Sequence, residues 1–342
     1  MSDHYAPHPG AKFEGWYSKF TLSSGWSVCL IISSVPAAAR QCHSEADLRT
    51  RRPYYICLTY VSPDSTTHCQ KEYWPLRFDV DTSDAGFKVS WGNAGYLIWD
   101  KKNDVVSWKL EESDARFTAE TNGPRTPWAR GDPTSTPAGL IASLPSPIQW
   151  HVQSLSTPCA YTIDIDGHDK STGEGYVHHE KNWAVSFPNS YIWLQARDDK
   201  KQKGLCLAGG SLVPGVQAYL VGYQGERSLS ASYIPWSILG LSPTGLTTDI
   251  SYPDRRFNID VKGWFRRLKV TAQAPDDTFF TFAAPLDTGH KPDYTVQSYG
   301  TRVEVEVMER SWPWEAWRRV EREVYERGAL EFGGDFYKSH SS

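Results

Sequence analysis

The 342-residue chain contains 15 tryptophans, 18 tyrosines and 13 phenylalanines but only 2 methionines, and 22% of its residues are charged. This composition is typical of a globular protein with a large core, and the length favours two domains or two lobes. The formal charge of −4, without long runs of Lys or Arg, excludes the basic surface that nucleic acids and acidic membranes attract. We therefore expect neither partner.

The first ten residues are polar and lack the apolar segment of a secretory signal, and the best apolar run, at 28–32, is too short for a transmembrane helix. The six cysteines show no CxxC spacing, so we expect neither a zinc site nor a redox motif. Free thiols in a reducing compartment are the simplest interpretation. We therefore expect a soluble, cytoplasmic protein without stable membrane insertion.

Apolar and polar residues alternate along most of the chain, which is the pattern of half-buried strands. The alternation predicts strands, in chain order, at residues 16–22, 55–61, 87–91, 105–110, 149–155, 161–165, 191–196, 216–223, 257–264, 268–272 and 303–307. Clusters of Gly, Pro, Asp and Asn separate them, and Asp166-Gly167 indicates a hairpin. This spacing predicts an all-β fold, built as antiparallel barrels or sandwiches.

A proline-rich stretch at 121–147 interrupts this pattern. We interpret it as the connection between an N-terminal β lobe at 1–120 and a C-terminal β lobe at 148–342. A linker and a functional cover both fit a loop of this length.

Residues 314–327 differ from the strands because Trp317, Val320 and Val324 are spaced i, i+3, i+7, and Gly328 follows as a stop signal. We predict a short C-terminal helix packed on the outside of a barrel. A membrane-surface helix fits less well, because its acidic and basic residues nearly cancel.

Two stretches place an acid beside aromatic residues: FEGWY at 13–17, with Glu14, and HHEKNWAVSFP at 178–188, with Glu180. A carboxylic acid inside an aromatic-lined interior is desolvated, which raises its pKa and suits a general acid. The alternative for both is a structural bond to backbone amides or to an arginine at a barrel end. Lys181 should point to the opposite face of a regular strand from Glu180, so these two residues should not share a site.

The His178-His179-Glu180 sequence suggests a metal, but only His178 and Glu180 can converge on one face of a strand. Zinc catalysis normally takes three protein ligands, so we expect no metal and no cofactor. The sequence also contains no GxSxG elbow, Walker loop or dinucleotide fingerprint. Hydrolase, kinase and dehydrogenase chemistry are therefore not expected.

The FEGWY stretch, the EKNWxxxFP stretch at 180–188 and the YIWLQA strand at 191–196 resemble the signature segments of the tocopherol cyclase family. Weaker matches follow in order at 209–210, 235–236, 270–275 and 331–334. The resemblance implies two lipocalin-like antiparallel β-barrel or half-barrel lobes that enclose a mainly apolar cavity. In that family a prenyl double bond is protonated and a phenol oxygen captures the cation, while relatives in secondary metabolism close rings by cycloaddition.

These features together predict a cofactor-independent cyclase or pericyclase for a hydrophobic terpenoid or polyketide precursor. It would close an oxygen heterocycle, of the chroman or dihydropyran type, by proton-driven closure or by hetero-Diels–Alder addition. Holding the reactive conformer supplies much of such catalysis, and stiff aromatic side chains suit that task. The alternative is a non-catalytic lipocalin-like carrier, since an apolar barrel binds a hydrophobic small molecule without any catalytic group.

The candidate catalytic residues are Glu180, Glu14 and Arg302, the last chosen from its position beside a strand as a group to bind a ketone or phenol oxygen. Trp16 also fits a structural role at the floor of a barrel. The candidate substrate-binding residues are Trp16, Tyr17, Trp99, His178, Trp183, Trp193, Tyr223, Trp236, Phe279, Phe282 and Tyr294.

Overall fold

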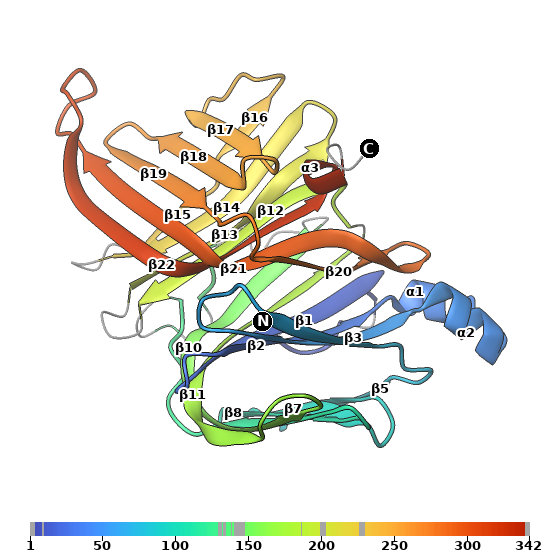
Figure 1. Ribbon diagram of the computed structural model, residues 1–342. Helices are drawn as coiled ribbons and strands as arrows, with labels where there is room; N and C mark the ends of the chain where they lie inside the picture. The colour runs from blue at the N-terminus through green and yellow to red at the C-terminus, as the bar shows by residue number, and fades with distance from the viewer. Residues whose placement is uncertain are drawn as a thin grey trace.

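The computed structural model describes residues 4–8, 10–128, 132, 135–137, 139, 148–185, 187–198, 203–225 and 230–338. These residues form two antiparallel sheets of eleven strands each, with three short helices (Figure 1). Each sheet makes one lobe: the N-terminal sheet is a half-barrel and the C-terminal sheet is a nearly closed barrel. The predicted all-β class with two lipocalin-like lobes is therefore confirmed.

The N-terminal lobe takes its strands from the first half of the chain, in the spatial order β4-β3-β2-β1-β11-β10-β9-β8-β7-β6-β5. Its elements are β1 (Phe13–Leu22), β2 (Ser27–Ser34), α1 (Pro36–Ala39), α2 (Glu45–Arg51), β3 (Tyr54–Val61), β4 (His68–Tyr73), β5 (Asp79–Ser83), β6 (Gly86–Ser90), β7 (Gly95–Asp100), β8 (Val105–Glu111), β9 (Ala115–Thr121), β10 (Ile148–Ile165) and β11 (Ser171–Ala184).

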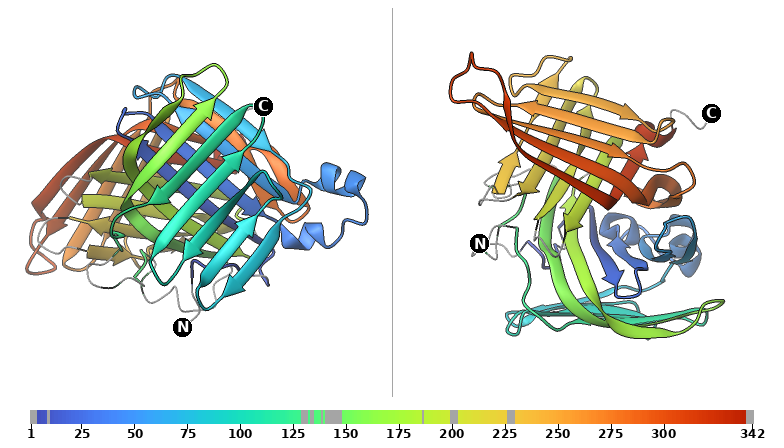
Figure 2. Two further views of the ribbon diagram at one scale, coloured as in Figure 1. Left: turned by 90° about the horizontal axis from the view of Figure 1, so that it is seen from below. Right: turned by 60° about the vertical axis from the view of Figure 1, so that its left-hand side comes forward.

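The long strands β10 and β11 bend, so that the N-terminal sheet curves over itself and encloses its own core (Figure 2). The register of β10 against β11 shifts between Val152 and Ser154 and again between Ser154 and Thr157, and such bulges bend a strand. Along β9 every second residue is buried, as the alternation in the sequence predicts. The predicted hairpin is confirmed, since β10 and β11 are joined by a turn with Gly167 at φ 85°.

The C-terminal lobe follows the spatial order β15-β14-β13-β12-β22-β21-β19-β18-β17, with β16 paired to β14 and β20 paired to β21. Its elements are β12 (Ser190–Asp198), β13 (Lys203–Val213), β14 (Val216–Gln224), β15 (Ser230–Tyr233), β16 (Trp236–Ile238), β17 (Leu246–Ser251), β18 (Arg256–Lys262), β19 (Arg266–Gln273), β20 (Phe279–Leu286), β21 (Gly289–Glu309), β22 (Arg318–Gly334) and α3 (Asp335–Lys338).

The two lobes pack against each other through a third apolar cluster, distinct from the core of either lobe. The N-terminal lobe contributes Tyr55 and Trp150, and the C-terminal lobe contributes Trp193, Phe280 and Phe282. In Figure 1, β1, β2 and β3 lie directly beneath β20 and the neighbouring strands of the upper lobe. This interlobe layer holds the candidate site.

The predicted boundary between the lobes is wrong. The stretch 121–147 connects β9 to β10, which are neighbours in the N-terminal sheet, and the chain passes to the second lobe between β11 and β12. Proline density marked an irregular loop but carried no information on strand pairing. The described part of this loop does contact the second lobe, because Gln224 donates a hydrogen bond to the Trp128 carbonyl.

The predicted helix at 314–327 is also wrong. A loop is followed by β22 from Arg318, and the short C-terminal helix is α3, Asp335–Lys338. The Arg and Glu side chains pair across strands rather than along a helix: Arg322 bonds Glu304 at 2.7 Å on β21. Tyr325, which the helical pattern left out, is buried in the barrel core.

Candidate functional site

A cavity of about 310 Å³ lies between the two lobes. Strands β1, β2, β10 and β11 form one wall, and strands β12, β13, β14, β20 and β22 form most of the other. Most of the lining is apolar, and its aromatic members are Phe13, Trp16, Tyr17, Trp150, Phe187, Tyr191, Trp193, Tyr219 and Phe282. Two carboxylic acids, Glu180 and Glu331, line the same cavity.

The two sequence motifs lie side by side on neighbouring strands. In the register of β1 with β11, Gly15 lies opposite Asn182, and Tyr17 lies opposite Glu180. A Cβ atom at Gly15 would lie 2.9 Å from Asn182 Oδ1, so the glycine leaves room for this side chain. The FEGWY and EKNW segments therefore build one wall of the cavity together.

Glu331 of β22 is buried and fully hydrogen-bonded within its own sheet. Its Oε1 accepts hydrogen bonds from the Tyr191 hydroxyl at 2.5 Å and from the Thr295 hydroxyl at 3.1 Å, and its Oε2 accepts one from Gln297 Nε2 at 3.0 Å. Burial raises the pKa of the Glu331 carboxyl to about 7, and the charge of Glu180 adds to this effect. Glu331 therefore changes its protonation state near neutral pH.

Glu180 is buried on the opposite wall, where its Oε2 lies 3.1 Å from His178 Nε2. The convergence of His178 and Glu180 on one face of a strand is confirmed. Their neighbour Lys181 points to the other face, also as predicted, and its ammonium group lies 4.4 Å from the centre of the Trp16 ring.

Tyrosine hydroxyls join the two walls. The Tyr17 hydroxyl lies 2.7 Å from the Tyr299 hydroxyl and donates a hydrogen bond of 3.2 Å to Gln297 Oε1. Burial raises the pKa of both phenols well above the usual value, so both stay protonated. Because Gln297 also bonds Glu331, a continuous polar chain runs from Tyr17 to that acid.

Two indole N–H groups in the cavity wall lack a hydrogen-bond partner among the described residues: Nε1 of Trp150 and Nε1 of Trp193. A buried donor without a partner is uncommon in folded proteins and costs free energy. These donors come from different lobes, and both belong to residues that line the cavity.

Glu14 lies on the face of β1 away from this chemistry. Its Oε2 lies 3.0 Å from Lys181 Nζ and accepts a hydrogen bond of 2.8 Å from the backbone N–H of His8. Lys181 also donates to the Ala6 carbonyl, so this ion pair fixes the N-terminal segment inside the first lobe. These contacts match the structural alternative for Glu14.

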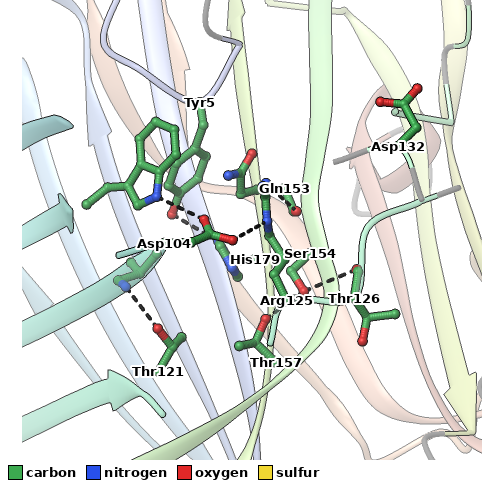
Figure 3. A network of polar contacts seen from close by, with 12 residues as sticks. Tyr5, Asp104, Thr121, Arg125, Thr126, Asp132, Gln153, Ser154, Thr157 and His179 are labelled. Atoms are coloured by element: carbon green, nitrogen blue, oxygen red, sulfur yellow. Dashed lines mark hydrogen bonds and ion pairs between the residues drawn. The ribbon is translucent and has the colours of Figure 1, made fainter. Parts of the chain in front are cut away.

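A second polar network lies behind the same wall, inside the N-terminal lobe (Figure 3). His179, between the two cavity-facing residues of β11, contacts the Tyr5 hydroxyl at 3.1 Å, and burial keeps the pKa of this imidazole well below 6.5. Nearby, Arg125 Nε donates to Asp104 Oδ2 at 3.1 Å (Figure 3). This network anchors the N-terminal segment and the start of the proline-rich loop.

Five predicted site residues line the large cavity: Glu180, Trp16, Tyr17, Trp193 and Phe282. His178 lines a smaller adjoining cavity. Trp16 reaches the wall but its ring packs in the core of the first lobe, as its structural alternative describes.

The structure does not bring the remaining predicted residues to either cavity. Trp99 and Trp183 lie on the far side of the wall in the first lobe, where Trp99 packs on Tyr5 and Trp183 stacks on His8. Four more lie in the second lobe. Tyr223 and Phe279 pack with its core, and Trp236 is 38% exposed on β16. Tyr294 packs against Phe187, which lines the cavity.

The expectation that Arg302 reaches a cavity is wrong. Arg302 lies on the outer face of β21, where it is half-exposed and paired with Glu326 of β22. Its alternation partners Thr301 and Val303 are the buried residues of that stretch. Position next to a strand could not distinguish the inner from the outer face.

Sequence reasoning missed Glu331 and Tyr191 as site residues. The available signal for Glu331 was a single acid within the apolar run GALEFGG, two residues before the glycine on which the Tyr191 ring packs. A Cβ at Gly333 would lie only 1.9 Å from Tyr191 Cε1. Gly333 therefore leaves the space that the Tyr191 ring occupies beside Glu331.

No group of three or more His, Cys, Asp or Glu side chains among the described residues is arranged to hold a metal ion. All six cysteines, including the buried Cys29, Cys57 and Cys206, are free thiols. None of the described helices is long and apolar enough to cross a membrane.

Fold and cavity together define a two-lobed, lipocalin-like all-β protein with an apolar interlobe pocket that contains two acids. The sequence matches no protein-family model and no curated protein, so the resemblance to the tocopherol cyclase family stays a prediction.

Solved structures share the fold. One is a putative AttH protein from Nitrosomonas europaea, with 13% identity and a TM-score of 0.53 over 98% of this chain and 96% of that chain. Another is kievitone hydratase from Nectria haematococca, with 10% identity and a TM-score of 0.51 over 97% of this chain and 91% of that chain. At these identities the likeness shows the fold alone.

Proposed function

We propose that this protein is a cofactor-independent cyclase that closes an oxygen heterocycle, of the chroman or dihydropyran type, on a hydrophobic terpenoid or polyketide precursor. The observation that carries the proposal is a buried acid, Glu331, with a pKa of about 7 in the wall of an apolar cavity of about 310 Å³. A general acid works best when its pKa lies near the working pH.

The reaction needs one proton and no co-reactant. The Glu331 carboxyl gives its proton to an alkene carbon, and the resulting cation is captured by a hydroxyl oxygen of the same substrate, which forms the C–O bond. The proton released by that oxygen restores the acid. The hydrogen bonds from Tyr191, Thr295 and Gln297 stabilise the carboxylate while the proton is away.

The rest of the cavity positions the substrate. The faces of Tyr17, Trp193 and Phe282 suit an unsaturated chain and a developing cation. The indole N–H groups of Trp150 and Trp193 supply donors for a carbonyl or phenol oxygen. A site that holds both reacting ends of a substrate in the reactive geometry lowers the activation barrier by several kcal/mol, which is the order of magnitude known from intramolecular reactions.

The name of one structural neighbour, kievitone hydratase, is consistent with the same first step. A hydratase and a proton-driven cyclase both generate a cation from an alkene and differ in whether water or an internal oxygen captures it. The mainly apolar lining of this cavity favours capture by the substrate's own oxygen. Binding by a non-catalytic carrier would not require a buried acid in the cavity wall.

The test is to incubate the purified protein with a geranyl-substituted hydroquinone and to follow chroman formation and its enantiomeric ratio by chiral chromatography. We expect ring closure that Glu331→Gln lowers at least tenfold, with a smaller loss for Glu180→Gln. Glu326→Gln is the matched control, because this carboxylate is exposed and pairs with Arg302 on the outer face of the barrel.

The same rate and isomer ratio without protein would reject the cyclase. Release of a tertiary alcohol instead of the chroman would identify a hydratase, and tight binding with recovery of unchanged substrate would identify a carrier. If cavity substitutions such as Phe282→Ala abolish closure while both acid variants retain it, the ring closes by cycloaddition rather than by proton transfer.

A further inference from the structure

A second cavity, of about 120 Å³, also lies between strands of the two lobes. On β1 the lining passes from Tyr17 to Lys19, two residues further along. Because every second residue of a strand faces the same side, both residues lie on the interlobe face.

The other strands repeat this relationship. On β11 the lining passes from Glu180 to His178, and on β12 it passes from Trp193 to Gln195. The two cavities therefore follow each other along the same three strands, and the His178–Glu180 contact of 3.1 Å joins a residue of one lining to a residue of the other.

The second cavity differs from the first in charge. Lys19, Arg197 and Arg327 line it, whereas none of its lining residues is an acid. Lys19 is only 8% exposed, and its ammonium group donates to Gln195 Oε1 at 3.2 Å. The same ammonium group lies 4.7 Å from the centre of the Tyr299 ring, so Lys19 places positive charge at the wall of this cavity.

His178 adds an independent observation. Its side chain is 4% exposed, its Nε2 contacts Glu180, and its Nδ1 has no hydrogen-bond partner within the described part of the chain. Buried polar atoms nearly always have a partner, so an orphaned nitrogen in a cavity wall indicates a position for a bound polar group. Because Nε2 is engaged by Glu180, Nδ1 is the ring nitrogen that remains for a bound polar group.

The cavity is open to solvent at the same end. Thr21 is exposed, and Tyr176 is 46% exposed, whereas Lys19 and His178 lie deeper in the lining. A molecule that inserts its apolar part into the large cavity would leave its head group here, close to the surface. The volume suits a small anionic group rather than a second ring system.

We propose that this cavity binds the carboxylate of an amphiphilic ligand whose apolar part occupies the large cavity. The inference rests on the proposed function for the role of the large cavity, and it narrows the substrate class to terpenoid or polyketide acids. Lys19 and Arg327 supply the charge, and His178 Nδ1 supplies a directed donor. Hydrogen bonds from charged donors to a carboxylate are among the strongest in proteins.

The test compares two saturated probes, dodecanoate and dodecanol, by isothermal titration calorimetry at low and high salt. Neither probe contains an alkene, so binding is measured without any ring closure. We expect dodecanoate to bind at least tenfold more tightly than dodecanol at low salt, with a smaller advantage at high salt because salt screens the interaction.

Variants assign the effect to the cavity. Lys19→Gln should remove most of the advantage of dodecanoate, and Lys19→Arg should keep it. Thr21→Asp should weaken dodecanoate binding at least fivefold, whereas Thr21→Asn should not. Position 21 is exposed, and the two variants differ only in charge. Melting temperatures show that each variant is folded, and the Thr21 pair keeps the test valid if Lys19→Gln does not fold.

Equal affinities for dodecanoate and dodecanol would overturn the proposal. It would also fail if inorganic phosphate bound with the same dependence on Lys19 and Thr21 while dodecanoate showed none, since the cavity would then hold a free anion. If the protein cyclised no prenylated phenol at all, the comparison of dodecanoate with dodecanol would still stand. The cyclase proposal and the carboxylate-site proposal can therefore fail separately.

Discussion

The Tyr191 hydroxyl donates a hydrogen bond of 2.5 Å to Glu331 across the neighbouring strands β12 and β22. The two residues are 140 positions apart in the sequence, and the Tyr191 ring occupies the space over Gly333. This contact fixes the position of the acid in the cavity wall and stabilises its ionised form.

The raised pKa of Glu331 makes stability depend on pH. Because the folded state holds this proton more tightly than the unfolded chain, the contribution to stability is complete below pH 4.5 and is lost as the pH rises through about 7. Relative to Glu331→Gln, the wild-type free energy of unfolding should fall by about 1.4 kcal/mol per pH unit within that window. Urea unfolding at a series of pH values measures this slope, and parallel curves would contradict the assignment.

His290 should make the free energy of unfolding depend on pH in the opposite direction. Its Nδ1–H donates to the Arg52 carbonyl at 2.8 Å, its Nε2 contacts the Ser33 hydroxyl at 2.9 Å, and burial lowers its pKa to about 4. Its contribution is present above pH 6.5 and is lost as the pH falls through about 4. Relative to His290→Gln, the wild type should lose about 1.4 kcal/mol per pH unit across this range.

Gly333→Ala should displace the Tyr191 ring, since the new Cβ would lie 1.9 Å from Tyr191 Cε1. We expect a loss of roughly 1–3 kcal/mol in unfolding free energy, as for other overpacked sites. Ring closure should decrease more than the folded fraction does, because the Glu331 bond is lost as well. Gly10→Ala is the control, as a Cβ there meets no atom within 4 Å.

Lys181→Met should destabilise the protein strongly because it leaves the Glu14 carboxylate buried without its cation. The expected cost is about 3–5 kcal/mol in unfolding free energy. Adding Glu14→Gln to this variant should recover a large part of it. A double-mutant cycle by urea unfolding measures the coupling, and a fall in turnover per folded molecule of Glu14→Gln would instead restore Glu14 as a catalytic candidate.

Trp150→Phe and Trp193→Phe test the two cavity-wall indole N–H groups that find no partner among the described residues, since each variant keeps an aromatic ring and removes one donor. Each variant should bind 1-naphthol about 3- to 10-fold more weakly, the range expected for one hydrogen bond. Naphthalene, which has no oxygen, should bind as tightly as to the wild type. Calorimetric titration with both probes separates the lost hydrogen bond from a change in cavity shape.

The strands and the all-β class could be predicted from the sequence because burial on one face of a sheet produces a period of two. The same rule placed Glu180 with His178 and separated both from Lys181. The helix predicted at 314–327 was wrong because valines at helical spacing also fit a strand. In the structure this strand pairs with β21, and its charged residues face those of β21. The spacing of apolar residues within one segment does not show whether another strand pairs with that segment.

Long-range pairing explains the other differences. The lobe boundary was misplaced because proline content shows where a chain is irregular, while the β9–β10 pairing decides to which sheet the flanking strands belong. Glu331 and Tyr191 meet only through the β12–β22 register, which no local pattern encodes. Arg302 was misassigned for the same reason, since only the register places it outside.

The cavity wall is made largely of side chains that neither lobe needs for its own core. Tyr17, Trp193 and Phe282 belong to the interlobe cluster, whereas each barrel packs around a separate set of residues. Substitutions at these positions therefore change the shape of the binding space without altering the core of either lobe. An architecture of this kind can evolve toward new ligands one lining residue at a time, while selection on each core preserves the scaffold.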